Sequence, residues 1–304
     1  MANLSTDAVP LTPGPRYTPC PWSKAKLKAL GKSIRDSTEV PAGVPTYVEV
    51  MAWYNRLVGE AQRFLIASDW EPLLGPQHPS ITGRFKTEET LRDKLQRQPD
   101  YKLPSIQDVA GVRFEADMRL DQQDAVVQSI VAHNLDGGVP AEVLDRRSGD
   151  HAGYRAVHVI LRPPGACPIE VQVRTSLQGR WANLYETLAD KVGREIRYGG
   201  IPRDKHLAQI VQLVEEISVD LIARYEAQQV KLFTQMTRVE RLQNPAKLEV
   251  AADLEGIERH LGELGAKVEH HLEWVRQRLV EAIPSRDWSM VDKHTKGPTT
   301  CLDS

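Results

Sequence analysis

Apolar residues recur at three- and four-residue steps along the early part of the chain, which is the spacing of one face of an α-helix. The longest such stripe holds Tyr47, Val50, Met51, Tyr54, Leu57, Val58, Ala61 and Leu65. A shorter pattern follows Ser23, a residue type that favours helix N-termini. Its apolar face holds Leu27, Leu30 and Ile34. The sequence therefore predicts two amphipathic helices, followed by a loop over 70–79, where proline and glycine are frequent.

In the middle of the chain, apolar residues follow one another at shorter spacing than in a helix, and β-branched residues become frequent. Strand-like segments of this kind cover 106–116, 156–161 and 169–175. Helical patterns cover 87–96, 121–133 and 177–192. Because strands and helices alternate here, we expect a β-sheet with helices packed against it.

The chain after the break at 198–202 returns to helical spacing. Two apolar stripes lie at 210–222 and 254–279, and stripes of this kind usually form a core or a partner interface. Asn244 and Pro245 interrupt the pattern between them. We therefore expect a proline-rich disordered leader, a main domain, a helical extension and a loose tail. Their expected bounds are 1–22, 23–205, 206–283 and 284–304.

Composition fits a globular protein, since 41% of the 304 residues are hydrophobic and 26% are charged. The formal net charge of -2 excludes a chain-wide attraction to nucleic acid, so a polyanion would be met by local clusters of Lys and Arg. Cys20, Cys167 and Cys301 lie far apart and suggest neither a disulfide framework nor a zinc site. No apolar run approaches the roughly 18 residues of a membrane span. We expect a soluble, cytoplasmic protein without a membrane partner.

Two carboxylates interrupt the apolar, strand-like segments. Asp108 precedes the run VAGVRF, and Glu170 stands between Ile169 and Val171. An unpaired charge is costly in such a setting, so each carboxylate needs a partner. A shared Mg²⁺ bound to substrate phosphates would supply one. A salt bridge is the alternative, with Arg113, Arg155 and Arg174 as its candidate partners.

A basic helix precedes these carboxylates, and Thr87 is placed to open it as TEETLRDKL. Lys86, Thr90 and Lys94 then share one side of the helix, because they are four residues apart. With Arg84 just upstream, the helix N-terminus and these cations favour binding of a triphosphate. The alternative is an exposed basic face paired with nearby acids, namely Glu88, Glu89 and Asp93.

An aromatic and basic loop, HAGYRAVH, lies between the two carboxylate segments. Gly153 lets the chain turn close to a ligand, and Tyr154 offers a ring on which a base can stack. Arg155 and His158 offer donors to phosphate, although a core position for His158 is equally consistent with the pattern. The basic residues of 24–35 fit either a solvated helix face or an arm for a phosphate backbone.

Four motifs occur in order along the chain: GRFKTEETLRDKL, IQDVAGVRF, GYRAVH and EVQVRTSLQGRWA. Together they resemble the synthetase domain of the RelA/SpoT family, in particular the small alarmone synthetases, over about residues 45–205. The resemblance implies an α+β fold, with a nucleotidyltransferase-like mixed β-sheet flanked by helices and with helical N- and C-terminal extensions. It also implies transfer of the β,γ-diphosphate of ATP to the ribose 3′-hydroxyl of GDP or GTP, which makes (p)ppGpp.

The same resemblance implies roles on the donor side of the reaction. Arg84 and Arg113 would sandwich the adenine of ATP. Its phosphates would be held by Lys86, Thr90 and Lys94, with Thr90 where the family usually has Ser.

The resemblance also implies a catalytic pair and an acceptor side. Asp108 and Glu170 would bind Mg²⁺, and Glu170 would orient or deprotonate the attacking hydroxyl. Tyr154 would stack on the acceptor base, and His158 would contact phosphate. The other acceptor-side residues are Arg155, Gln172 and Arg174, the last two as supports of one strand.

The hydrolase half of long family members depends on a His-Asp motif, and this chain has no His-Asp dipeptide, so we expect synthesis without hydrolysis. The segment WANLYETLADKVGREIRYGG resembles the toxin branch of small synthetases, which are encoded with antitoxins. Members of that branch pyrophosphorylate the tRNA 3′-CCA end or make adenosine alarmones. A third hypothesis is an idle relative whose helical extension binds an antitoxin or a phage protein. A homo-oligomer is compatible with the family, whose members range from monomers to tetramers.

Overall fold

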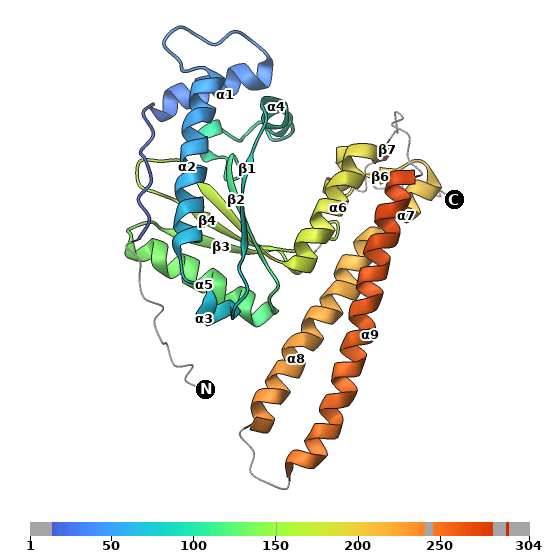
Figure 1. Ribbon diagram of the computed structural model, residues 1–304. Coiled ribbons are helices and arrows are strands. Elements are labelled where there is room, and N and C mark those ends of the chain that lie inside the picture. The colour runs from blue at the N-terminus through green and yellow to red at the C-terminus, as the bar shows by residue number, and fades with distance from the viewer. Residues whose placement is uncertain (1–13, 150, 241–245, 282–289, 292–304) are drawn as a thin grey trace, which may run out of the picture. The chain divides into compact units, whose positions relative to one another are not determined.

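The computed structural model describes residues 14–149, 151–240, 246–281 and 290–291 (Figure 1). The chain divides into two compact units, which we call the sheet unit and the helical unit. The sheet unit comprises Met1–Met118, Gln122–Asp145 and Ala156–Thr175. The helical unit comprises Arg119–Asp121, Arg146–Arg155 and Ser176–Ser304. The main domain expected over 23–205 therefore contributes to both units.

The sheet unit is built on a five-stranded sheet of order β1-β2-β5-β4-β3. The strands are β1 (Ser80–Phe85), β2 (Ala110–Ala116), β3 (Ala141–Asp145), β4 (Val157–Leu161) and β5 (Ile169–Thr175). β2 and β5 are parallel, whereas the other neighbouring pairs are antiparallel. This mixed sheet with flanking helices confirms the predicted α+β fold class.

The helices of this unit begin where their sequences provide caps. They are α1 (Lys24–Asp36), α2 (Tyr47–Ala67), α3 (Glu71–Leu74), α4 (Glu88–Arg97), the 3₁₀ turn η1 (Leu103–Ser105) and α5 (Leu120–Asp136). Ser23 caps α1, and Thr46 forms a capping box with Glu49 at the start of α2. Both amphipathic helices predicted from the apolar period are therefore confirmed.

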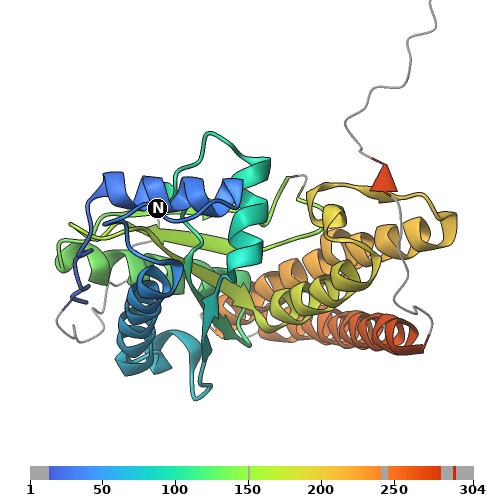
Figure 2. The same ribbon diagram turned by 90° about the horizontal axis from the view of Figure 1, so that it is seen from above.

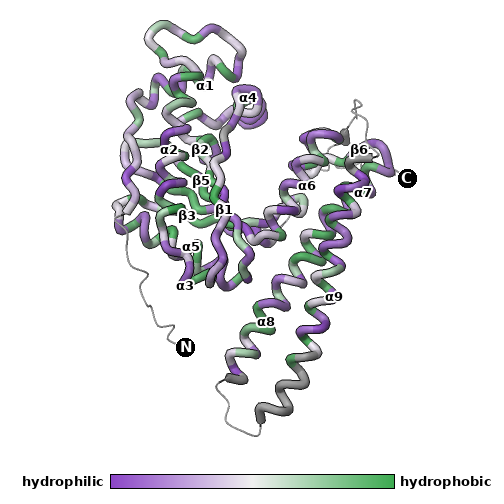
Figure 3. The backbone as a smooth tube through the Cα atoms, viewed as in Figure 1, coloured by the Kyte–Doolittle hydropathy of each residue, from purple (hydrophilic) through white to green (hydrophobic). Residues whose placement is uncertain are grey.

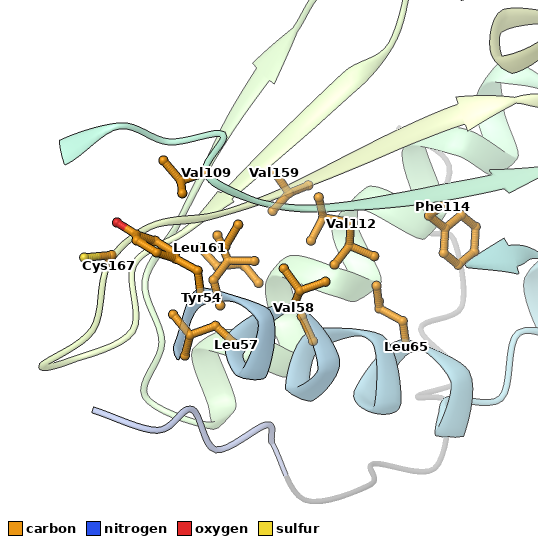
Figure 4. Close-up of a cluster of buried hydrophobic side chains, with 14 of the residues drawn as sticks. Tyr54, Leu57, Val58, Leu65, Val109, Val112, Phe114, Val159, Leu161 and Cys167 are labelled. Atoms are coloured by element: carbon orange, nitrogen blue, oxygen red, sulfur yellow. The ribbon is translucent and has the colours of Figure 1, made fainter. Parts of the chain in front are cut away.

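The core of the sheet unit lies between α2, α5 and one face of the sheet. Figure 4 shows Leu57, Val58 and Leu65 of α2 reaching the side chains of the strands. Gly83 of β1 allows a close approach, because a Cβ there would lie 2.8 Å from Val58 Cγ1. Val126 and Ile130 of α5 belong to the same buried cluster.

The opposite face of the same strands is polar, because side chains alternate along a strand. In β5, Val171 and Val173 join the core, while Glu170, Gln172 and Arg174 share the other face. The registers Gly111↔Glu170, Arg113↔Gln172 and His158↔Gln172 place the partner side chains on that face too. We call it the polar face.

Three elements of this unit differ from the sequence-based expectations. β1 and β3 were not predicted, and α3 lies inside the loop expected over 70–79. The leader expected to be disordered to residue 22 is wrong for its described part. There Tyr17 Oη donates to Asn134 Oδ1 at 3.1 Å, and Cys20 N donates to Gly165 O at 2.8 Å. These contacts fix residues 14–22 against the core.

The helical unit has a separate core around Trp181, Leu188, Val214, Val268 and Val275. Its elements are α6 (Ser176–Val192), η2 (Arg194–Tyr198), β6 (Ile201–Pro202), α7 (Lys205–Glu216), the π-helix η3 (Ile217–Ile222), α8 (Ala223–Glu240), α9 (Ala246–Glu281) and β7 (Met290–Val291). β6 pairs with β7, and α8 packs beside α9 (Figures 1 and 2).

The two apolar stripes predicted for the helical extension are helical where the structure describes them. The first stripe, 210–222, lies in α7 and η3. The second, 254–279, lies in α9, where hydrophobic and hydrophilic residues alternate as an amphipathic helix requires (Figure 3). The break at Asn244-Pro245 lies outside the described residues, as does the loose tail expected over 284–304 apart from 290–291. Among the described helices, none combines the length and the apolar character needed to cross a membrane.

Candidate active site

The two carboxylates lie at the N-terminal ends of two interior strands, β2 and β5. Asp108 lies two residues before β2, and Glu170 is the second residue of β5. The two strands are parallel, with Ala110 opposite Ile169, so their first residues lie side by side. The charge of Asp108 also raises the pKa of Glu170, although other contacts outweigh this effect. The two carboxylates are therefore electrostatic neighbours.

Asp108 is held by two lysines from a single segment of chain. Lys86 Nζ lies 2.8 Å from Asp108 Oδ2, and Lys94 Nζ lies 2.8 Å from Asp108 Oδ1. Burial raises the pKa of the Asp108 carboxyl, but the two ammonium groups outweigh burial and hold it well below its usual range. Asp108 is therefore ionised at neutral pH. The salt-bridge partners of Asp108 are thus lysines and not the arginines named as the alternative.

The two lysines flank most of α4, with Lys86 just before its N-cap and Lys94 in its last turn. Thr87 is its N-cap and accepts from Thr90 N at 3.3 Å, while Thr90 Oγ1 donates to Thr87 O at 2.9 Å. Lys86 precedes the cap, so it lies where the helix dipole favours anions. Burial lowers the pKa of Lys86, and Asp108 raises it in part. The alternative of an exposed basic face is wrong for this pair, since Glu88 binds Arg92 instead.

Glu170 is nearly buried, at 6% relative exposure, and both of its oxygens are engaged. His158 Nδ1 lies 2.9 Å from Oε1, and Gln172 Nε2 donates to Oε2 at 2.7 Å. Burial raises the pKa of Glu170, but His158 and the hydrogen bond from Gln172 lower it below its ordinary value. His158 thus contacts the carboxylate of Glu170 on the neighbouring strand, and its contact with phosphate stays a prediction.

A polar ladder continues along β5 and supports Glu170. Arg174 Nη2 donates to Gln172 Oε1 at 2.7 Å, which fixes the orientation of the amide that holds Glu170. Arg174 Nη1 lies 3.4 Å from Glu115 Oε1 on β2. Arg174 is 1% exposed, so it supports the ladder from within the protein. Gln172 and Arg174 therefore form one hydrogen-bonded ladder on β5, and their role on the acceptor side stays a prediction.

The two arginines predicted to hold adenine share the polar face. Arg84 of β1 pairs with Gly111, and Arg113 lies two residues further along β2. Diagonal neighbours of this kind are about 7–8 Å apart. A Cβ at Gly111 would lie 3.4 Å from Arg84 Cβ, so the glycine keeps space beside that arginine.

The carboxylate pair fits Mg²⁺ as a partial ligand set. Among the described residues, no group of three or more His, Cys, Asp and Glu side chains is arranged to hold a metal. Mg²⁺ commonly takes one or two carboxylates and completes its octahedron with water and substrate phosphates. Each oxygen of Asp108 and Glu170 already accepts one contact, and a carboxylate oxygen has two lone pairs. Asp108 and Glu170 can therefore bind Mg²⁺ together with a phosphate ligand.

Tyr154 and Arg155 belong to the helical unit, unlike the other predicted site residues. Tyr154 is half-buried. Arg155 is 6% exposed, and its Nη2 lies 2.7 Å from Glu226 Oε2. The guanidinium is therefore held by a buried carboxylate, which does not fit its predicted contact with acceptor phosphate.

Three supporting residues were missed by sequence reasoning. Glu115 pairs with Arg174, Gln123 Nε2 donates to Val173 O at 2.9 Å, and Glu226 pairs with Arg155. The polar alternation of β2 could have indicated Glu115. Gln123 and Glu226 lie in helical patterns, where a polar residue gives no sign that it will be buried.

Comparison with known proteins identifies the family. Residues 83–192 match the model described as "Region found in RelA / SpoT proteins", which spans the predicted residues from Arg84 to Arg174. The small alarmone synthetase 1 from Bacillus subtilis has a similar fold, with a TM-score of 0.51 at 20% identity over 63% of this chain and 98% of that chain.

Two mycobacterial proteins, both described as uncharacterized, are more similar in sequence. One is from Mycobacterium tuberculosis (strain ATCC 25618 / H37Rv) and the other from Mycobacterium bovis. Each is 40% identical over 215 residues, which is 68% of this chain and 76% of the relative. With these relatives and the matched region, the chain belongs to the RelA/SpoT family.

Proposed function

We propose that the chain is an ATP-dependent pyrophosphotransferase, which moves the β,γ-diphosphate of ATP to the ribose 3′-hydroxyl of GDP or GTP and makes (p)ppGpp. One observation carries this proposal within the RelA/SpoT family. Asp108, held between Lys86 and Lys94, is an electrostatic neighbour of the buried carboxylate Glu170. Phosphoryl transfer requires this combination of cations for phosphate and carboxylates for metal.

The donor side of the reaction follows from the polar face. Lys86 precedes the N-cap of α4 and Lys94 lies in its last turn, so the ATP phosphates meet two ammonium groups, and near Lys86 they also meet the positive end of the helix. The phosphates then share these cations with Asp108. Arg84 and Arg113 hold the adenine, since guanidinium planes stack on aromatic rings.

Asp108 and Glu170 would hold Mg²⁺ together with the phosphates. When bound, the ion would neutralise phosphate charge and polarise the β-phosphorus. Without a third protein ligand among the described residues, the site depends on its substrate to complete the metal shell.

The chemical step forms a bond between the acceptor 3′-oxygen and the β-phosphorus and breaks the bond from that phosphorus to the oxygen shared with the α-phosphate. AMP leaves with that oxygen. Glu170 is ionised, because His158 and Gln172 lower its pKa, so it accepts a hydrogen bond from the attacking hydroxyl. A carboxylate with a lowered pKa is a weak base. Glu170 therefore chiefly orients the hydroxyl, and the released proton passes through it to solvent.

A second acceptor class, the 3′ end of tRNA, is favoured by one feature of the sheet unit. A pocket of about 280 Å³ is lined by four cations, Lys28, Lys32, Arg35 and Lys102. Lys28 and Lys32 are exposed on α1, as a polyanion-binding surface requires. The chemistry is the same for both acceptors, and only the molecule that presents the hydroxyl differs.

One assay tests these readings. Purified protein is incubated with ATP labelled in the γ-phosphate, Mg²⁺, and GDP, GTP, AMP or deacylated tRNA in parallel. Label in GDP or GTP is the expected result. Label in tRNA or AMP would mean that the protein transfers pyrophosphate to that molecule instead of GDP or GTP. Absence of label with every acceptor would overturn the proposed function in favour of a binding module.

A further inference from the structure

Tyr154 lies near the end of the loop 146–155, in which residues 151–155 have a constrained backbone. Ala152 and Gly153 are both in the left-handed region, with φ of 50° and 79°, and Tyr154 N donates to His151 O at 3.0 Å. A non-glycine residue in this region is uncommon and is maintained by its surroundings. Residues 151–155 are therefore held in one conformation by the elements they contact.

Gly153 fits the loop closely against α6 and α7. A Cβ at Gly153 would lie 2.7 Å from Trp181 Cζ2 and 3.0 Å from Glu215 Cα. Trp181 is itself fixed, because it is 1% exposed and its Nε1 donates to Val214 O at 2.6 Å. Both the positive φ and the close contact require glycine here.

Arg155 anchors the end of the loop in the helical extension. Its Nη2 lies 2.7 Å from Glu226 Oε2, and Glu226 is 1% exposed. Gln178 Nε2 donates to the other oxygen of Glu226 at 3.0 Å. Arg155 Nε also donates to Arg147 O at 3.3 Å, which joins the two ends of the loop. A buried ion pair of this kind is costly to break from one side.

The anchor coincides with the π-helix between α7 and α8. η3 covers Ile217–Ile222, and Arg155 Nη1 lies 3.5 Å from Ser218 O within it. π-helices are rare and often mark functional sites, because their wider turn disturbs the backbone hydrogen bonds. Arg155 thus contacts a carbonyl of η3 and the side chain of Glu226, which follows in α8.

We infer that Glu226, through its ion pair with Arg155, is a positioning residue that holds Tyr154 in place for the acceptor base. This inference rests on the proposed pyrophosphate transfer. Arg155 then acts as the link between loop and helix, instead of contacting acceptor phosphate. Within the helical unit, α7, η3 and α8 thereby fix the residues around Tyr154.

The test removes both buried charges together. The double variant Arg155→Gln, Glu226→Gln keeps hydrogen-bonding groups and leaves no unpaired charge. We expect its KM for GDP to rise about tenfold, since ordering of a loop on binding weakens affinity, while its KM for ATP stays within about twofold. Amide hydrogen exchange at residues 146–155 should become faster. The matched control is Arg180→Gln, Glu269→Gln, which removes an exposed pair of the same unit and should change neither quantity.

Several outcomes decide the inference. Unchanged KM for GDP and unchanged exchange at 146–155 would overturn it. An equal rise of both KM values would also overturn it, because that indicates general damage. If the double variant does not fold, Glu226→Asp is tested in its place, because it keeps the charge and shortens the side chain. A selective rise in its KM for GDP would support the inference. An unchanged KM for GDP would contradict it. If the wild-type protein transfers no label at all, the proposed function fails, and exchange at 146–155 alone still decides whether Glu226 fixes the loop.

Discussion

The two faces of the five-stranded sheet are built by the same strands and have opposite properties. On one face Val112, Phe114, Val159, Val171 and Val173 are at most 2% exposed and pack in the core with α2 and α5. The polar face holds the side chains in alternate positions, including Arg113, His158 and Glu170. Successive side chains of a strand point to opposite faces of the sheet. Neighbouring residues of one strand therefore serve different purposes, one stability and the next activity.

The two faces also differ in what their residues require. Apolar side chains need matching shape and removal from water. The buried charges of the polar face need specific partners, and Glu170, Gln172, Arg174 and Glu115 provide them to one another in sequence along the face. A change on the core face should therefore reduce stability, and a change on the polar face should reduce activity.

The largest expected effect comes from the carboxylates of the polar face. Glu170→Gln keeps the shape of the side chain and removes its charge, so transfer of label from ATP should fall about 10³-fold. Asp108→Asn should cause a similar loss. Both proteins should remain folded, as judged by a cooperative melting transition.

The contrast fails if either variant retains activity near the wild-type level. Such a result would exclude that carboxylate from the metal site and the reaction. Loss of activity together with loss of the cooperative transition would instead mean that the polar face is required for folding.

A substitution on the core face should reduce stability and leave activity unchanged. Leu57 of α2 is fully buried, and Leu57→Ala should lower the free energy of unfolding by about 2–5 kcal/mol, through lost transfer energy and a cavity. Activity per folded molecule, measured well below the melting temperature, should be unchanged. Denaturant unfolding and the label-transfer assay give the two quantities, and a matching loss of activity would contradict the separation of the faces.

Sequence reasoning identified the local features of the sheet unit. α2, α4 and β5 follow from short-range periods and caps, and the observed bounds of β5 equal the predicted ones. β1 was missed because Thr82, Gly83 and Arg84 break the apolar alternation. β3 is only five residues long, is mostly exposed and includes Glu142 and Asp145, so its apolar signal is weak.

The missing parts of the site are those that depend on contacts between distant segments. The carboxylates and lysines were recognised, but the pairing of Asp108 with Lys86 and Lys94 joins residues that are 22 and 14 positions apart in the chain. Likewise, nothing near Arg155 in the sequence indicates that Glu226 is its partner. The order β1-β2-β5-β4-β3 is also set by long-range pairing and not by local pattern.

The smallest expected effect concerns how well the core face of the sheet excludes water. Cys167 lies in that core beside Tyr54 (Figure 4), and burial raises the pKa of its thiol to about 11. In the unfolded chain the thiol ionises near pH 8.5, so the unfolded state loses its proton first as pH rises. The thiol therefore contributes stability below about pH 8.5, and this contribution declines as pH rises towards 11.

Between about pH 7.5 and pH 9.5 the free energy of unfolding should fall by about 1 kcal/mol more in the wild type than in Cys167→Val. The comparison isolates the thiol, because the other groups that titrate in this range are present in both proteins. Urea unfolding curves at these pH values measure the difference. Parallel pH dependence in the two proteins would mean that the Cys167 thiol ionises as easily in the folded state as in water, so that this side of the sheet is more accessible to solvent than its packing indicates.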